Sequence, residues 1–301
     1  MSKESENNST SLKATLIIAL IKVLAAMPLA LSKLCLRPFA WLQWLIPNES
    51  VRVAKLNLNY CLPNKSEAQI SAISRELIKH NMNLIAETTH IWRHDYTVNK
   101  RMLKHLHGLE ELKTAMQSES GTLLFSPHIG NWELTYAFLA NEFNSSGIYK
   151  PPNIPELEDM MLAGRRGGGK IFRTQARDIR NMLKELKQGG SLFLLPDQQP
   201  PKGSGVFASF FNQPAYTMTL IQGLLQRTGS DFWLCYSVFE KDGYVIYAKK
   251  VAIDGSLPAE DFAEALNCTM EDVIQQSPEQ YQWTYKRFKR TPDGSPSIYN
   301  R

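Results

Sequence analysis

TLLFSPHIGNWEL, residues 122–134, is an apolar run that ends on Ser-Pro-His, turns on Gly-Asn and continues into helix-forming residues. We expect a strand over 122–125 and a helix from Asn131, because asparagine is a favoured helix cap. Gly130 permits the tight turn between them. His128 would then lie at the carboxyl end of a strand, where open α/β sheets place their functional sites.

His128 and Glu133 form a candidate acid–base pair in this segment. Glu133 falls in the first turn of the predicted helix, where the helix dipole favours a carboxylate, and it can fold back toward the imidazole. A carboxylate beside a histidine fixes its tautomer and stabilises the imidazolium, so the pair can deprotonate a hydroxyl. Ser126 lacks a nucleophile-elbow sequence, which makes direct transfer to a bound hydroxyl the simpler chemistry. His-x-x-x-x-Glu alone is a weak pattern, and a lone histidine at a strand end can be structural; the flanking strand and Gly-Asn-Trp make it specific.

Strands and helices alternate along the rest of the chain. This order predicts an α/β fold with a mainly parallel central sheet and covering helices. Residues 50–94 are helical in pattern and include a capping box at Ser66 and Gln69. The other predicted strands are 147–149, 191–195, 231–239 and 243–251, and the other predicted helices are 106–117, 131–140, 154–164, 177–188, 216–227 and 258–276.

The N-terminal part is expected to contact a membrane. Residues 1–13 are polar and are predicted to be frayed, whereas 14–46 is the most apolar stretch of the chain. It predicts a hydrophobic membrane helix ahead of the α/β domain, either a marginal transmembrane span, because Lys22 interrupts it, or an amphipathic helix in the interface. Trp41 and Trp44 are typical of an aromatic belt, which argues against a buried core helix. If the helix spans, the basic residues after it place the rest of the chain in the cytoplasm.

Composition excludes several classes of protein. The 301 residues are 43% hydrophobic and 21% charged, as in a folded protein, and the net charge of +5 favours anionic lipids or an acidic partner. We expect no nucleic acid partner, because no nucleic-acid module accompanies this charge. The four cysteines are scattered, as in reduced structural thiols, and His90 and His94 lack the glutamate of a zinc protease motif. We expect no metal site and no cofactor.

The segment HIGNWEL resembles the H-x4-(D/E) motif of the glycerolipid and lipid A acyltransferases, in the form found in the late acyltransferases of lipid A biosynthesis. Similar segments follow one another along nearly the whole chain. The resemblance implies an anchor region over 14–46 and an acyltransferase domain over 47–301, within the lysophospholipid acyltransferase superfamily. The other segments are VAKLNLNYCLPNKSEAQISAI, YKPPNIPELEDMMLAGR, LLPDQQPPKGSGVFASFFNQPAYTMT and SPEQYQWTYKRFKRTPDGSPSIY.

The resemblance also implies roles for residues. His128 would deprotonate the acceptor hydroxyl, with Glu133 as its partner. Arg165 would hold an anionic group near the site, and the adjacent Arg166 could take that role instead. Asn131 would help to hold the pair or the oxyanion.

Asp197 and two basic segments complete the candidate site. Asp197 follows the strand 191–195 and so reaches the same edge of the sheet; its alternative role is that of a turn former before two prolines. The basic segment 164–173 contains three consecutive glycines and predicts an anion-binding loop. A second basic segment, YKRFKR at 285–290, is a candidate surface for a carrier protein or lipid headgroups.

The implied activity is that of a membrane-bound O-acyltransferase in lipopolysaccharide biosynthesis. It would move a fatty acyl chain from acyl carrier protein, in preference to coenzyme A, to a hydroxyl of a lipid A precursor, forming an acyloxyacyl ester. The expected location is the inner membrane, in contact with its lipids, with the catalytic domain on the cytoplasmic face. The alternatives are acylation of a lysophospholipid or another membrane glycolipid, hydrolysis of the acyl donor, and lipid binding without catalysis.

Overall fold

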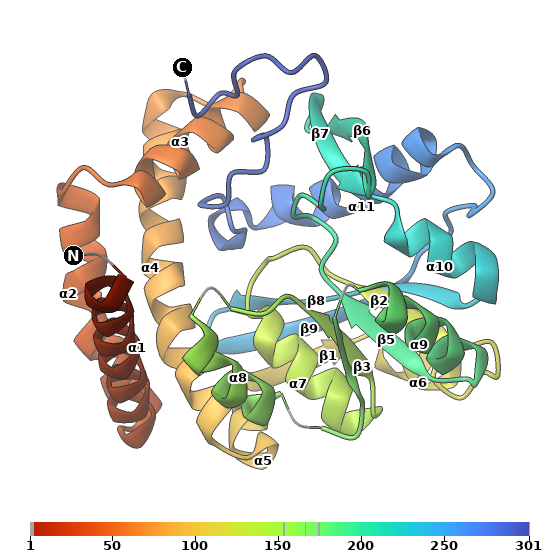
Figure 1. Cartoon of the computed structure of the whole chain (residues 1–301), viewed down its shortest axis with the longest axis horizontal. Coiled ribbons are helices and arrows are strands. Elements are labelled where there is room, and N and C mark those ends of the chain that lie inside the picture. The colour runs from red at the N-terminus through yellow and green to blue at the C-terminus, as the bar shows by residue number, and fades with distance from the viewer. Residues whose placement is uncertain (1–2, 153, 166, 174, 301) are drawn as a thin grey trace.

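The computed structural model describes residues 3–152, 154–165, 167–173 and 175–300. Its centre is a seven-stranded sheet in the order β1-β9-β8-β2-β5-β3-β4, with helices packed on both faces (Figure 1). Five neighbouring strands from β8 to β4 run parallel, and β9 and β1 run in the opposite direction, which confirms a mainly parallel sheet. The strands are β1 (Leu103–His107), β2 (Thr122–Phe125), β3 (Ser146–Tyr149), β4 (Ile171–Arg173), β5 (Ser191–Leu194), β8 (Asp231–Glu240) and β9 (Gly243–Lys250).

The central strands β2 and β5 are covered on both faces. All four residues of each strand are buried, as the apolar sequences TLLF and SLFL predict. Leu123 and Phe125 pack into the core on one face, and Leu124 packs into the core on the other. The helices around the sheet are α3 (Glu49–Cys61), α4 (Glu67–Arg93), α5 (Tyr96–Asn99), α6 (Leu109–Ala115), α7 (Trp132–Glu142), α8 (Glu158–Gly164), α9 (Ala176–Lys187), α10 (Leu220–Thr228) and α11 (Ala259–Gln276).

A two-stranded hairpin, β6 (Gly205–Phe210) and β7 (Gln213–Met218), lies outside the main sheet. The helix predicted over 216–227 therefore begins too early, because Tyr216 and Thr217 pair with β6 and the helix starts at Leu220. The helix predicted over 106–117 also begins too early, since its first residues belong to β1.

The apolar region 14–46 forms two helices. They are α1 (Lys3–Ala26), which includes most of the polar N-terminus that we expected to be frayed, and α2 (Leu29–Leu45). Within the described residues, none of the helices has the combination of length and apolar character that crossing a bilayer requires. The first of the two alternatives for 14–46, a transmembrane span, is therefore not supported. Both helices lie outside α4, at the side of the molecule away from the sheet (Figure 1).

The helices α1 and α2 pack against the long helix α4. It begins with the predicted capping box, in which Ser66 and Gln69 satisfy each other's backbone N–H groups. Near its other end, the Nε2 atoms of His90 and His94 donate to the carbonyl oxygens of Leu24 and Ala25, at 3.2 and 2.8 Å. These histidines thus bind the last carbonyls of α1. No group of three or more His, Cys, Asp or Glu side chains that could hold a metal ion occurs in the described part of the chain.

Candidate active site

The loop between β2 and α7 carries the central residue of the site. Asn131 caps α7, as predicted, because its Oδ1 accepts a hydrogen bond of 2.9 Å from the backbone N–H of Leu134. Gly130 has a φ of 54°, and a Cβ atom there would lie 1.7 Å from the carbonyl oxygen of Ser237. Only glycine fits this turn, which sets the direction in which His128 leaves the sheet.

His128 is bound by Asp197, which follows the neighbouring strand β5. The Nδ1 atom of His128 lies 2.6 Å from Oδ1 of Asp197, and the backbone N–H of His128 donates to Oδ2 at 2.9 Å. A carboxylate only accepts, so Nδ1 carries the proton and Nε2 is the basic nitrogen. The side-chain amide of Gln198 donates to that Nε2 at 3.2 Å and to Oε1 of Gln282 at 3.0 Å.

The surroundings of Asp197 keep it ionised. Its side chain is 2% exposed, and this burial works against the charged form. The charge and hydrogen bonds of His128, together with the charge of Arg287, nevertheless hold the pKa of Asp197 below its ordinary value. The site therefore places a fixed negative charge behind an imidazole whose other nitrogen faces outward to Gln198.

Glu133 is bound by Arg165 instead of His128. The Nε atom of Arg165 donates to Oε2 of Glu133 at 3.0 Å, its Nη2 atom donates to Oε1, and the indole N–H of Trp92 donates to Oε2 at 3.3 Å. Burial disfavours the charge of Arg165, but Glu133 raises its pKa above the ordinary value. No hydrogen bond between Glu133 and His128 occurs among the described residues. The two predicted partners thus belong to two separate pairs, His128 with Asp197 and Glu133 with Arg165.

Asn131 is 1% exposed and supports the loop from within. Its Nδ2 donates to Oε2 of Glu87 at 2.8 Å, while its Oδ1 caps α7, so both ends of the amide are used inside the protein. We expected Asn131 to help to hold the catalytic pair or the oxyanion; in the structure its amide binds Glu87 and the backbone of α7. Arg166, the alternative to Arg165, lies outside the described residues.

The two basic segments are also largely engaged within the protein. In the first, Lys170 pairs with Glu185 at 2.7 Å, and Arg173 pairs with Glu158. Its three consecutive glycines, 167–169, pack against the end of α7 and the start of β3, where a Cβ atom on any of them would meet residues 140–146. Their packing therefore explains the three glycines without a bound anion.

In the second segment, Arg287 is 3% exposed and lies beneath the hairpin. Its guanidinium donates to the carbonyl of Tyr216 at 2.5 Å and to Oγ1 of Thr217 at 2.8 Å. Lys286 pairs with Glu49 at 2.7 Å. Arg287 is thus a structural residue and does not belong to the predicted basic surface.

Several residues that support the loop were missed in the sequence. The buried His80 donates from Nε2 to the carbonyl of Gly130 at 3.2 Å. The C-terminal segment forms two backbone hydrogen bonds with the loop, from the N–H of Gly130 to the carbonyl of Gln280 and from the N–H of Gln282 to the carbonyl of His128, both at 3.0 Å. Of the residues around the loop that the sequence analysis did not predict, only Gln198 could have been found from the sequence, because it directly follows the candidate residue Asp197.

Known proteins of one bacterial family are similar to this chain over most of its length. The model of the bacterial lipid A biosynthesis acyltransferase family matches residues 2–290. The chain is 26% identical to the lipid A biosynthesis lauroyltransferase of Escherichia coli K12, over 82% of each chain. It is also 26% identical to the palmitoleoyltransferase of that organism, over 82% of this chain and 81% of the relative, and 26% identical to a lipid A biosynthesis acyltransferase of Haemophilus influenzae, over 87% and 86%.

Proposed function

Because this chain belongs to the bacterial lipid A biosynthesis acyltransferase family, we propose that it transfers a fatty acyl chain from acyl carrier protein to a hydroxyl of a lipid A precursor. The family supports acyl transfer in lipid A biosynthesis, and the three relatives above are all named for it. The donor and the acyloxyacyl ester product are our proposal. The observation that carries it is the pairing of His128 with Asp197 at the carboxyl ends of adjacent parallel strands.

The proposed reaction starts at Nε2 of His128. The acceptor hydroxyl takes the place of the Gln198 amide and gives its proton to Nε2 while its oxygen attacks the thioester carbonyl carbon. Asp197 stabilises the imidazolium that forms. The carbon–sulfur bond then breaks, and the departing thiolate of the carrier takes the proton from Nε2. The base is thereby regenerated, so one ester and one thiol form with no net change in the enzyme.

Glu133 acts at a second place in this proposal. Since its carboxylate is bound at both oxygens by Arg165, we assign it to holding that guanidinium in place instead of orienting His128. A fork-shaped Arg–carboxylate pair is rigid, and it keeps a cation close to the helix that follows His128. Arg165 can in this way approach the anionic groups of the reactants.

The proposed site of action is the cytoplasmic face of the inner membrane. Of the thirteen exposed large hydrophobic side chains among the described residues, nine lie on α1 and α2, and a tenth, Ile46, directly follows α2. Such a surface suits helices that lie in the membrane interface, with the apolar side chains below the lipid headgroups. The enzyme would thus meet an acceptor that stays in the bilayer.

The first test is a transfer assay read by mass spectrometry. Purified full-length protein would be incubated with acyl carrier protein loaded with different fatty acids and an under-acylated lipid A precursor, alongside His128→Ala, Asp197→Asn and Glu133→Gln. We expect the wild type to add the mass of one acyl chain, and we expect His128→Ala and Asp197→Asn each to lower kcat by about 100-fold or more.

Glu133→Gln separates the two proposed pairs. We expect it to raise the KM of a substrate more than Asp197→Asn does, because it releases Arg165 and leaves the imidazole supported. If Asp197→Asn keeps wild-type kcat while Glu133→Gln loses it, the partner assignment is wrong. If the product is a free fatty acid or an acylated lysophospholipid, the proposed acceptor is wrong.

A further inference from the structure

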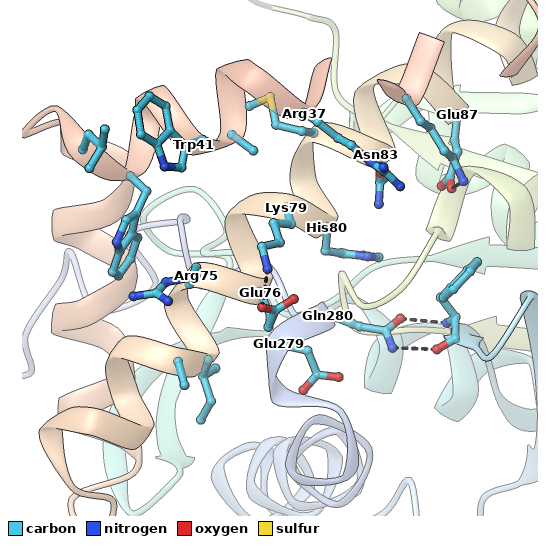
Figure 2. Close-up of a pocket in the computed structure, with 18 of the residues that line it drawn as sticks. Arg37, Trp41, Arg75, Glu76, Lys79, His80, Asn83, Glu87, Glu279 and Gln280 are labelled. Carbon is cyan, nitrogen blue, oxygen red and sulfur yellow. Dashed lines mark hydrogen bonds and ion pairs between the residues drawn. The ribbon is translucent and has the colours of Figure 1, made fainter. Parts of the chain in front are cut away.

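A groove with a cavity volume of about 1160 Å³ runs between α2 and α4. Figure 2 shows side chains of both helices along it, with Glu279 and Gln280 of the C-terminal segment facing them. Pockets for small molecules usually enclose about 300 to 1,000 Å³. This groove can therefore take a ligand larger than a small metabolite.

One part of the groove touches the loop that carries His128. Its lining includes His80, whose ring donates to the carbonyl of Gly130, and Gln280, whose carbonyl accepts from the N–H of Gly130. It also includes Glu87, which holds Asn131. A ligand in the groove would thus lie next to the residues that position the catalytic base.

Cationic side chains enter the groove from both helices. Two of them are paired with carboxylates: Lys33 with Glu87, and Lys79 with Glu76, each at 2.6 Å. Each helix supplies two of these cations at i, i+4 spacing, so that they share one side of the helix. The four are Lys33 and Arg37 on α2, and Arg75 and Lys79 on α4.

Arg37 and Arg75 form no ion pair with any residue that the structure describes. Arg75 lies against the ring of Trp44, with its guanidinium carbon 5.3 Å from the ring centre. The remaining acid in the groove is Glu279, on the opposite wall. Two exposed guanidinium groups are therefore open to an anion, and guanidinium binds phosphate through two parallel hydrogen bonds.

Apolar side chains of the lining adjoin the hydrophobic surface of α2. Trp41 and Trp44 line the groove, and Trp41 is 66% exposed. On the same helix, Leu34 and Phe39 are exposed to solvent. The groove thus combines a place for an anion with a route to an apolar phase, and this combination fits an amphiphile with a phosphorylated polar head.

We propose that this groove binds the phosphorylated sugar headgroup of the acceptor lipid, with Arg37 and Arg75 contacting its phosphate groups. The inference rests on the proposed function, since it names the part of the acceptor that the enzyme reads. The acyl chains of the acceptor stay along α2, and the headgroup reaches along the groove toward the loop of His128. The phosphate, instead of the acyl chain, selects the acceptor.

The test compares two acceptors, the phosphorylated lipid A precursor and the same molecule with its phosphates removed. Full-length wild type, Arg37→Gln, Arg75→Gln and the double variant would be assayed in detergent micelles, and kcat/KM would be measured for each acceptor. We expect the wild type to prefer the phosphorylated acceptor, and we expect the double variant to reduce that preference about tenfold or more. Arg101→Gln is the matched control, because Arg101 is exposed and lies outside the groove lining.

The ratio of the two kcat/KM values cancels any general loss of folded enzyme. If the double variant keeps the wild-type preference, or if Arg101→Gln reduces it equally, the groove does not bind the phosphate. A wild type that acylates both acceptors equally would also overturn the proposal. All three outcomes would leave the proposed acyl transfer intact.

A binding measurement tests the groove even if the wild type acylates neither acceptor, a result that would refute the proposed function. Neutral phosphatidylcholine vesicles would carry either the phosphorylated precursor or phosphatidylglycerol. A loss of about tenfold in the affinity of the double variant for the precursor alone supports the groove as its site. An equal loss for phosphatidylglycerol would mean that the arginines bind bulk anionic lipid, and unchanged affinity for both would mean that they bind neither.

Discussion

His128 has a partner at each ring nitrogen. Asp197 at Nδ1 stays through the proposed reaction, whereas the Gln198 amide at Nε2 has to leave before a hydroxyl can give up its proton. Gln198 is itself held by Gln282, from the C-terminal segment. A ligand must therefore replace a bound amide before it reaches the base, which disfavours weak ligands at this position.

Glu87 provides a test of how the loop is supported. It is 1% exposed and accepts hydrogen bonds from Asn131 at 2.8 Å and from the hydroxyl of Tyr244 at 2.7 Å, and it pairs with Lys33. Glu87→Gln removes the charge that neutralises Lys33. It also places the N–H donors of a glutamine amide beside the groups of Asn131 and Tyr244, which themselves donate. We expect it to lower the free energy of unfolding by about 1–3 kcal/mol, measured by urea denaturation.

The matched control is Glu76→Gln on the same helix. Glu76 also pairs with a lysine at 2.6 Å, but both side chains are more than half exposed, so the expected change is within about 1 kcal/mol. Adding Lys33→Met to Glu87→Gln should recover part of the loss, because no unpaired cation then remains. Equal effects of the two glutamine variants would show that the burial of Glu87 is unimportant.

The candidate residues could be located from the sequence, but their partners could not. His128, Glu133, Arg165 and Asp197 all lie in the region that the strand and helix pattern indicated. Proximity in sequence suggested Glu133 as the partner of His128, whereas the pairing of β2 with β5 brings in Asp197 from 69 residues away. That register depends on the whole sheet, and one motif does not contain it.

Among the elements, the buried strands were predictable and the edge strands were not. β2 and β5 have uniformly apolar sequences because both faces are covered. β1 and β4 are the two edges of the sheet, and β1 has the polar sequence LKHLH. The last three residues of the hairpin strand β7, 216–218, were predicted as helix because they run directly into the apolar residues of α10.

The histidines of α4 predict a pH dependence of stability. Burial lowers the pKa of His80, and burial together with the charge of His94 lowers that of His90. Histidine in an unfolded chain has a pKa of about 6.5. Just below that pH the unfolded chain therefore binds protons at these two positions that the folded protein does not bind. We expect the free energy of unfolding to be highest above that pH and to fall below it, by up to about 1.4 kcal/mol per pH unit for each histidine.

Urea denaturation between neutral and mildly acidic pH checks this expectation. His80→Gln keeps a donor for the carbonyl of Gly130. It should reduce the dependence of the free energy of unfolding on pH by the contribution of one histidine. His105→Gln is the control, because His105 is exposed on β1. A stability that does not change with pH would contradict the lowered pKa values.

On the scale of the whole molecule, the exposed apolar side chains are concentrated on the two N-terminal helices. Leu34 and Phe39 of α2 are 55% and 58% exposed and do not line the groove. The double substitution Leu34→Ser and Phe39→Ser should weaken binding to phospholipid vesicles about tenfold or more, because it removes apolar area that would enter the bilayer. Co-sedimentation with vesicles measures this change.

Val98→Ser is the control for the membrane surface. Val98 is 44% exposed and belongs to α5, not to α1 or α2, and its replacement should leave vesicle binding unchanged. If the double variant binds as tightly as the wild type, another part of the chain faces the membrane.

The contacts of the C-terminal segment set an order of events during synthesis. The loop of residues 128–130 takes two of its backbone hydrogen bonds from Gln280 and Gln282, which the ribosome adds about 150 residues later. Folding during synthesis generally proceeds from the N-terminal part of a protein. A nascent chain can thus already contain His128, Asp197 and the strands of the sheet while the loop of residues 128–130 still lacks these two hydrogen bonds. The two hydrogen bonds that hold this loop can therefore form only after residues 280–282 have been synthesised.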